Sequence, residues 1–147
     1  MTCPTSTPAE GYRFADHTGD VALELWAPTF HGLLAQALRG TVHFITDCPV
    51  SACPSPNLTH TITLPDGDAE QLLVSWINEV LWLAIHQQQI PVAASFSCEP
   101  GGLVAVVQCV EDSGVAIVTE VKSATYHGLN IVRDAASHFS AVVILDL

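Results

Sequence analysis

The sequence predicts an α+β fold in which two amphipathic helices pack on an antiparallel or mixed β-sheet. Two segments place apolar residues at helical spacing, several others alternate apolar and polar residues, and the later segments are joined by short turns. A chain of 147 residues is most simply one domain. We expect residues 1–10 to form a flexible tail and residues 11–147 to fold as a single unit.

The first strand is expected to begin at residues 12–14 and to be interrupted by the polar turn at residues 17–20, His-Thr-Gly-Asp. Residues 21–26 then alternate, with Val21, Leu23 and Leu25 on one face and Ala22, Glu24 and Trp26 on the other. This period of two predicts a strand with one buried face.

A first helix is predicted from Phe30 to about Phe44, with Thr29 as its N-cap. Gly40 should weaken this helix by roughly 1 kcal/mol relative to alanine. Residues 47–57 contain three prolines and two cysteines without periodicity, which predicts a loop.

Residues 59–64 alternate and predict a further strand. Asp68 and Gln71 then form the pattern of a capping box, which predicts the start of a second helix that extends to about Gln87. Pro91 ends this pattern. The strands expected after it cover residues 92–99, 103–110, 116–126, 129–132 and 139–145.

The composition is strongly acidic, with 15 acidic residues, four basic residues and a formal net charge of −11. Such a surface repels phosphate backbones, so direct nucleic-acid binding is not expected. The charge suits metal cations or a basic protein partner, or it simply keeps an apolar chain soluble. No apolar run is long enough to span a membrane, and residues 1–8 lack the features of a secretory signal, so we expect a cytoplasmic protein.

The five cysteines form no Cys-x-x-Cys pair, which argues against a disulfide framework or a zinc site. Cys98 and Cys109 lie within apolar runs, and we expect both to pack as small core residues.

Two acidic residues distant in the sequence mark strand ends. Asp20 precedes the strand at 21–26, and Asp146 follows the last strand, with the Leu147 carboxylate beside it. Carboxylate oxygens are the ligands that Ca²⁺ and Mg²⁺ prefer. Taken singly, each acid is more often a surface or turn residue. Two carboxylates held close together repel each other unless a cation or a shared proton neutralises them.

Three further residues have open roles. His17 is a ligand, a base or, most simply, a side chain that bonds the turn backbone. Lys122 is one of four basic residues and lies on one strand face with Glu120, where the simplest role is a cross-strand ion pair worth about 0.5 kcal/mol. The sequence has no nucleophile elbow, P-loop, dinucleotide-binding glycine motif or His-Glu-x-x-His motif.

Four separated segments resemble the archease family in order and spacing. They are residues 14–21 (FADHTGDV), 72–81 (LLVSWINEVL), 120–129 (EVKSATYHGL) and 144–147 (ILDL). The resemblance implies a protein cofactor, not an enzyme by itself, that assists RtcB-type RNA ligases in tRNA splicing or RNA repair. It implies that such a protein promotes guanylylation of the ligase histidine and multiple turnover.

Carried over residue by residue, the resemblance implies a divalent-cation site at Asp20, Asp146 and the Leu147 carboxylate, with Ca²⁺ as the expected ion and Mg²⁺ or Mn²⁺ as alternatives. Lys122 matches a lysine of the third motif and is implied to act beside the metal. Gly19 replaces the usual alanine of that family's first motif. Two other functions stay open: a chaperone or modulator of a tRNA-modifying enzyme such as a methyltransferase, and a metal-dependent hydrolase using Asp20 and Asp146.

Overall fold

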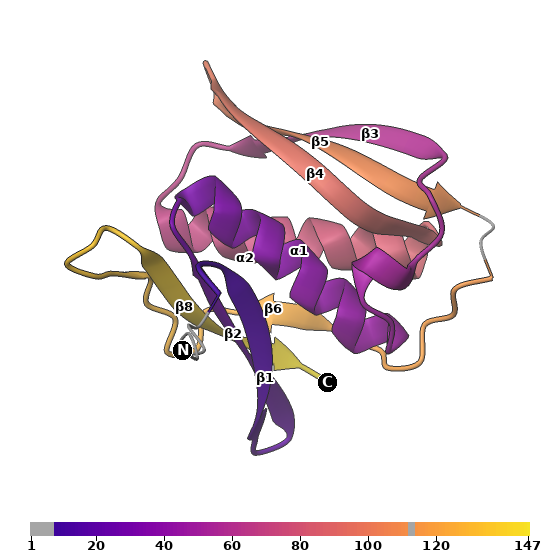
Figure 1. The fold of residues 1–147 in the computed structure, drawn as a ribbon, viewed down its shortest axis with the longest axis horizontal. Helices are drawn as coiled ribbons and strands as arrows, with labels where there is room; N and C mark the ends of the chain where they lie inside the picture. The colour runs from indigo at the N-terminus through magenta and orange to yellow at the C-terminus, as the bar shows by residue number, and fades with distance from the viewer. Residues whose placement is uncertain (1–7, 112–113) are drawn as a thin grey trace, which may run out of the picture.

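The protein is described by a computed structural model at residues 8–111 and 114–147. Two helices form a middle layer, with a three-stranded sheet on one side and a five-stranded sheet on the other (Figure 1). All strand pairings within these residues are antiparallel. The predicted α+β class is confirmed, and the strands are divided between two sheets because the helices bury apolar residues against both.

The five-stranded sheet has the order β1-β2-β8-β6, and β7 also pairs with β8. Its strands are β1 (Gly11–His17), β2 (Asp20–Ala27), β6 (Ser123–Thr125), β7 (Val132–Arg133) and β8 (Phe139–Asp146). Strands β2 and β8, which come from opposite ends of the sequence, therefore lie side by side (Figure 1). The three-stranded sheet has the order β3-β5-β4, built from β3 (Leu58–Pro65), β4 (Gln89–Glu99) and β5 (Gly102–Glu111).

Both helices begin where the sequence predicts. Helix α1 (Phe30–Thr46) is capped by Thr29, whose Oγ1 accepts from the Gly32 amide at 2.9 Å. Helix α2 (Ala69–Leu81) begins with the Asp68 capping box, which is complete. It continues as a π-helical turn, η2 (Trp82–His86), which the apolar spacing alone did not distinguish from an α-helix.

Gly40 does more than weaken α1, because it creates space for the sheet. A Cβ at this position would lie 2.7 Å from Leu23 Cδ1 and 3.1 Å from Tyr12 Cγ. The absence of a side chain lets α1 approach β1 and β2 closely.

Trp76 of α2 is fully buried on the other side of the helix layer. Its indole N–H donates to the Leu34 carbonyl of α1 at 2.8 Å.

Three strand predictions are wrong in extent. Of residues 116–126 only 123–125 form a strand, because the amides of Val118 and Thr119 donate instead to the Ile45 carbonyl, at 2.7 and 3.1 Å. Of residues 129–132 only the last enters β7. Pro91 does not precede β4 but lies within it, beside a β-bulge, where its missing amide is tolerated.

One of the two cysteine predictions is confirmed and the other is wrong. Cys109, in β5, is fully buried, as expected. The prediction that Cys98 is a core residue is wrong. Phe96 makes the last core contact of β4, with its ring 5.0 Å from that of Trp76, and Cys98 lies two residues further along, where it is exposed. Within the described residues, neither helix is long and apolar enough to cross a membrane. Most of the predicted tail at 1–10 lies outside the described residues.

Candidate metal centre

One row of residues crosses the end of the five-stranded sheet. Asp20 pairs with Asp146 between β2 and β8. Asp20 also pairs with His17 of β1, and Asp146 pairs with Ser123 of β6. Directly paired residues of antiparallel strands project to the same face with their Cβ atoms about 5 Å apart. The two acids predicted to mark strand ends are therefore neighbours. We call this row of His17, Asp20, Asp146 and Ser123 the acidic row.

This row projects away from the helices. Val21, Leu23 and Leu25 are buried on the face that α1 covers, so the alternation of β2 directs Asp20 to the outer face. The Asp20 side chain is about a quarter exposed, with 26% of its surface accessible. Water and ions can thus reach the carboxylates, while strand pairing fixes their backbones.

The electrostatics of the pair are unfavourable without a positive partner, because like charges directly opposite each other on a sheet are destabilising. His17 provides one such partner, with Nδ1 3.6 Å from Asp20 Oδ2, and it helps only when protonated. Of the three roles left open for His17, bonding to the turn backbone is not the contact observed. The imidazole lies against the carboxylate instead, and its ring centre is 6.2 Å from that of His127.

Lys122 reaches the row through its backbone, since its amide donates to the Asp146 carbonyl at 2.8 Å. Its side chain lines a neighbouring cleft of about 200 Å³ together with Glu120 and Trp82. Among the residues the structure describes, neither Glu120 nor Lys122 forms an ion pair. The cross-strand pair considered from the sequence is not made, because residues 120–122 are not in a strand.

The donor set has the chemistry of a hard-cation site, with two facing carboxylates on one accessible face. Within residues 8–111 and 114–147, however, no three His, Cys, Asp or Glu side chains come close enough to hold an ion by themselves. A cation at Asp20 and Asp146 therefore needs a further oxygen.

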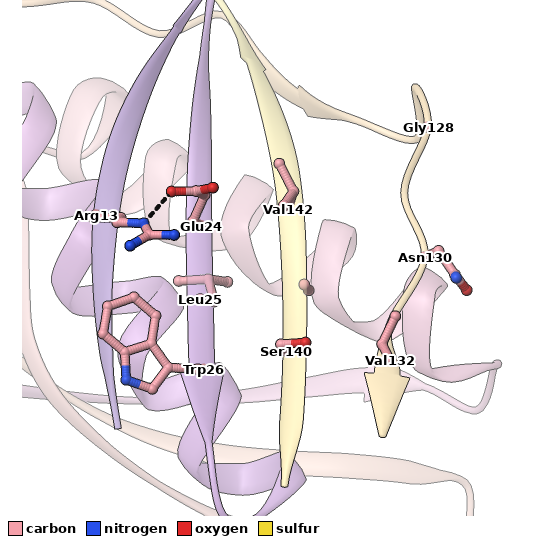
Figure 2. Close-up of a pocket in the computed structure, with 10 residues that line it drawn as sticks. Arg13, Glu24, Leu25, Trp26, Gly128, Asn130, Val132, Ser140 and Val142 are labelled. Atoms are coloured by element: carbon pink, nitrogen blue, oxygen red, sulfur yellow. Dashed lines mark hydrogen bonds and ion pairs between the residues drawn. The ribbon is translucent and has the colours of Figure 1, made fainter. Parts of the chain in front are cut away.

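A groove lies further along the same outer face, separated from the acidic row by the Ala22–Ile144 pair. Beyond Asp20 and Asp146, successive outward pairs on β2 and β8 are Ala22–Ile144, Glu24–Val142 and Trp26–Ser140. The last two pairs lie in a cavity of about 450 Å³. Figure 2 shows Trp26 and the Arg13–Glu24 ion pair on one side of it and residues 128–132 on the other.

No role for this groove is predicted from the sequence. The signal was present, because the alternation of residues 21–26 puts Glu24 and Trp26 on the face of Asp20. The sequence did not predict that Arg13 lies opposite Glu24, because this contact depends on the register of β1 against β2. It also did not predict that residues 128–132 lie across the groove, because their position depends on the route of the chain after β6.

A family comparison covers nearly the whole of this structure. The model of the archease protein family (MTH1598/TM1083) matches residues 12–147. The chain belongs to the archease family. His17, Asp20, Ser123 and Asp146, which form the acidic row, all lie within the matched range.

Individual members of the family align with different shares of this chain. A probable protein archease of Mycobacterium tuberculosis is 32% identical over 95 residues, which are 65% of this chain but only about half, 51%, of that protein. The protein archease of Methanosarcina barkeri is 26% identical over 97% of this chain and 99% of its own length.

Two solved structures share the archease fold. The solution structure of Methanobacterium thermoautotrophicum protein 1598 has a TM-score of 0.69 at 23% identity, and covers 93% of this chain and 99% of that one. The crystal structure of a Thermotoga maritima archease, described as a possible chaperone, has a TM-score of 0.60 at 21% identity, and covers 99% and 100% of the two chains.

Proposed function

We propose that this protein is an activator of an RtcB-type RNA ligase, and that the acidic row at the end of its five-stranded sheet is the active surface. The observation that supports the proposal is the direct pairing of Asp20 with Asp146. Two acids from opposite ends of the sequence share one row on an accessible face, although this arrangement is electrostatically costly. Membership of the archease family supports the activator role, through the resemblance stated from the sequence.

In this proposal Asp20, Asp146 and the Leu147 carboxylate hold a divalent cation, with Ca²⁺ expected and Mg²⁺ or Mn²⁺ as alternatives. When bound, such an ion supplies a positive charge that attracts phosphate oxygens. The chain's own residues prepare the site. The Lys122 amide holds the end of β8 through the Asp146 carbonyl, and the His17 ring lies beside the Asp20 carboxylate.

The test is guanylylation of the ligase histidine, measured with labelled GTP at limiting ligase. Wild-type protein should stimulate both guanylylation and multiple turnover, and Asp20→Ala should abolish most of the stimulation. Glu24→Gln is the matched control, because Glu24 lies on the same strand and face but pairs with Arg13. If Asp20→Ala stimulates as well as the wild type, the acidic row is not the active surface.

A second candidate function rests on the groove. The Thermotoga relative is described as a possible chaperone, and the groove exposes apolar surface of Trp26, Val132 and Val142 beside the acidic row. A chaperone or modulator of a tRNA-modifying enzyme, such as a methyltransferase, would use this surface to cover apolar segments of its client. This function predicts suppression of client aggregation that Trp26→Ala removes and Asp20→Ala leaves unchanged, which is the reverse of the ligase result.

A further inference from the structure

Two cysteine side chains meet in the loop between α1 and β3, away from the acidic row. Cys48 Sγ and Cys53 Sγ are 4.0 Å apart, and each lies 3.6 Å from the Pro49 carbonyl oxygen. Both cysteines are half-buried, so small reagents can reach them. Cys98, by contrast, is exposed beside His31, and Cys109 is fully buried.

The backbone holds this pair of thiols in place. The Cys48 amide donates to Thr46 Oγ1 at 3.2 Å, and that hydroxyl donates to the Val42 carbonyl at 2.7 Å. The Cys53 amide donates to the Val50 carbonyl at 3.2 Å at the end of a short 3-10 turn. Because a disulfide needs its sulfurs about 2.05 Å apart, side-chain rotation has to close about 2 Å.

We propose that Cys48 and Cys53 are a modification site at which a reversible intrachain disulfide forms by exchange with a low-molecular-weight disulfide such as oxidised glutathione. The Cys53 thiol donates to Cys48 Sγ, which leaves the Cys48 sulfur as the attacking atom. Its thiolate attacks one sulfur of the reagent and releases one glutathione thiolate, giving a mixed disulfide. Cys53 then loses its proton and attacks Cys48 Sγ, releasing the second glutathione. Two protein thiols are oxidised and one reagent disulfide is reduced to two thiols.

The second step should govern the pH dependence. Burial, and then the hydrogen bond to Cys48, raise the pKa of the Cys53 thiol to about 11. Burial, the largest of these causes, persists in the mixed disulfide, so closure should accelerate as the pH rises above neutral because the thiolate is the nucleophile.

The disulfide would restrain a junction of the fold. Two residues before Asp47, the Ile45 carbonyl accepts the amides of Val118 and Thr119, so the end of α1 holds the segment that leads to Lys122. A bridge between Cys48 and Cys53 fixes the chain where it leaves this junction. We expect a small rise in the melting temperature on oxidation and its reversal by a reducing agent. This inference is independent of the proposed ligase function.

The experiment uses the full chain with Cys3→Ser and Cys98→Ser, incubated with oxidised glutathione and followed by intact mass. The expected product has lost two hydrogens, about 2 Da, and retains no glutathione. Adding Cys48→Ser or Cys53→Ser should prevent this loss. If either further variant fails to fold, a non-reducing digest of wild-type protein locates the bridge directly.

Two results would overturn the inference. One is a stable glutathione adduct on Cys48 or Cys53 that never closes. The other is two free thiols at these positions in wild-type protein after Cys98, the exposed internal reference, has reacted completely.

Discussion

The two sheets pack on the same pair of helices, but their outer faces differ in charge. The outward positions in the paired rows of β3, β5 and β4 are mostly neutral: Thr59, Thr61, Thr63, Val104, Val106, Gln108, Ala93, Ser95 and Ser97. Glu99, which pairs with Gly102 at the end of β4, is the one ionisable residue among the outward positions of these rows. The corresponding face of the five-stranded sheet carries the ion pair Arg13–Glu24 and the row His17, Asp20 and Asp146.

This difference separates structural from functional requirements. Neutral, small and β-branched side chains are sufficient for an exposed sheet face. Two aspartates placed directly opposite each other are not needed for folding and oppose it slightly. We therefore expect changes on the three-stranded sheet to alter stability alone, and changes in the acidic row to alter activity more than stability.

The largest effect is expected from Gly102→Ala in the three-stranded sheet. Gly102 has a φ of 154°, and a Cβ there would lie 2.1 Å from the Leu64 carbonyl oxygen. The β3–β5 pairing would have to shift, at a cost of about 3 kcal/mol in the free energy of unfolding. Urea denaturation measures this. Under conditions where the variant is folded, stimulation of the ligase should match the wild type; a selective loss of stimulation would contradict the division between the sheets.

The next effect is on activity. Removing Asp146 and Leu147 should reduce stimulation of ligase guanylylation at least about tenfold, equivalent to roughly 1.4 kcal/mol. The far-ultraviolet circular dichroism spectrum should be unchanged, because the buried part of β8 ends at Leu145. Thr61→Ala, on the outer face of the other sheet, is the control and should stimulate fully. Full stimulation by the truncated protein would contradict a functional role for this end of the sheet.

Alkaline pH should affect the three-stranded sheet through Cys109. Burial raises the pKa of this thiol from 9.0 to about 11. A pKa that is higher in the folded state gives stability that is complete below about pH 9 and is lost as the pH rises towards 11. The loss from this group should be roughly 2–3 kcal/mol. Cys109→Ala should show a shallower decline of unfolding free energy over this interval, and an identical slope would contradict the assignment.

The smallest effect is expected from Asp20→Asn. Removing one of two facing charges should raise the free energy of unfolding by a few tenths of a kcal/mol, up to about 1 kcal/mol, in a chelator-containing buffer. Calcium chloride should raise the melting temperature of the wild type more than that of the variant. Equal calcium shifts would argue against a cation at the acidic row.

The local signals in the sequence were sufficient for most elements. The Thr29 cap, the Asp68 capping box and the alternation of residues 21–26 each predicted an element that the structure contains, because these features act within a few residues. The conformation of residues 116–122 was not predictable in this way. It depends on the Ile45 carbonyl, about seventy residues earlier in the chain, which accepts amides that a strand would otherwise have used.

The candidate site shows the same limit. That Asp20 and Asp146 begin and end strands could be read from the residues, but their pairing required the register of β2 against β8. The contact of His17 with Asp20 depends on the β1–β2 hairpin, and the groove beside them depends on how residues 128–132 cross the sheet. Long-range register sets all three, and short-range periodicity carries no information about it.

The missing side chain at Gly40 has a consequence for evolution of the site. The β1–β2 hairpin, which carries His17 and Asp20, packs on α1 at Gly40, where Leu23 and Tyr12 lie directly against the helix. A single methyl group there would force the Leu23 side chain and the Tyr12 ring to shift. Gly40 therefore acts as a spacer, and an archease with alanine at this position should carry a smaller residue where Leu23 or Tyr12 stands.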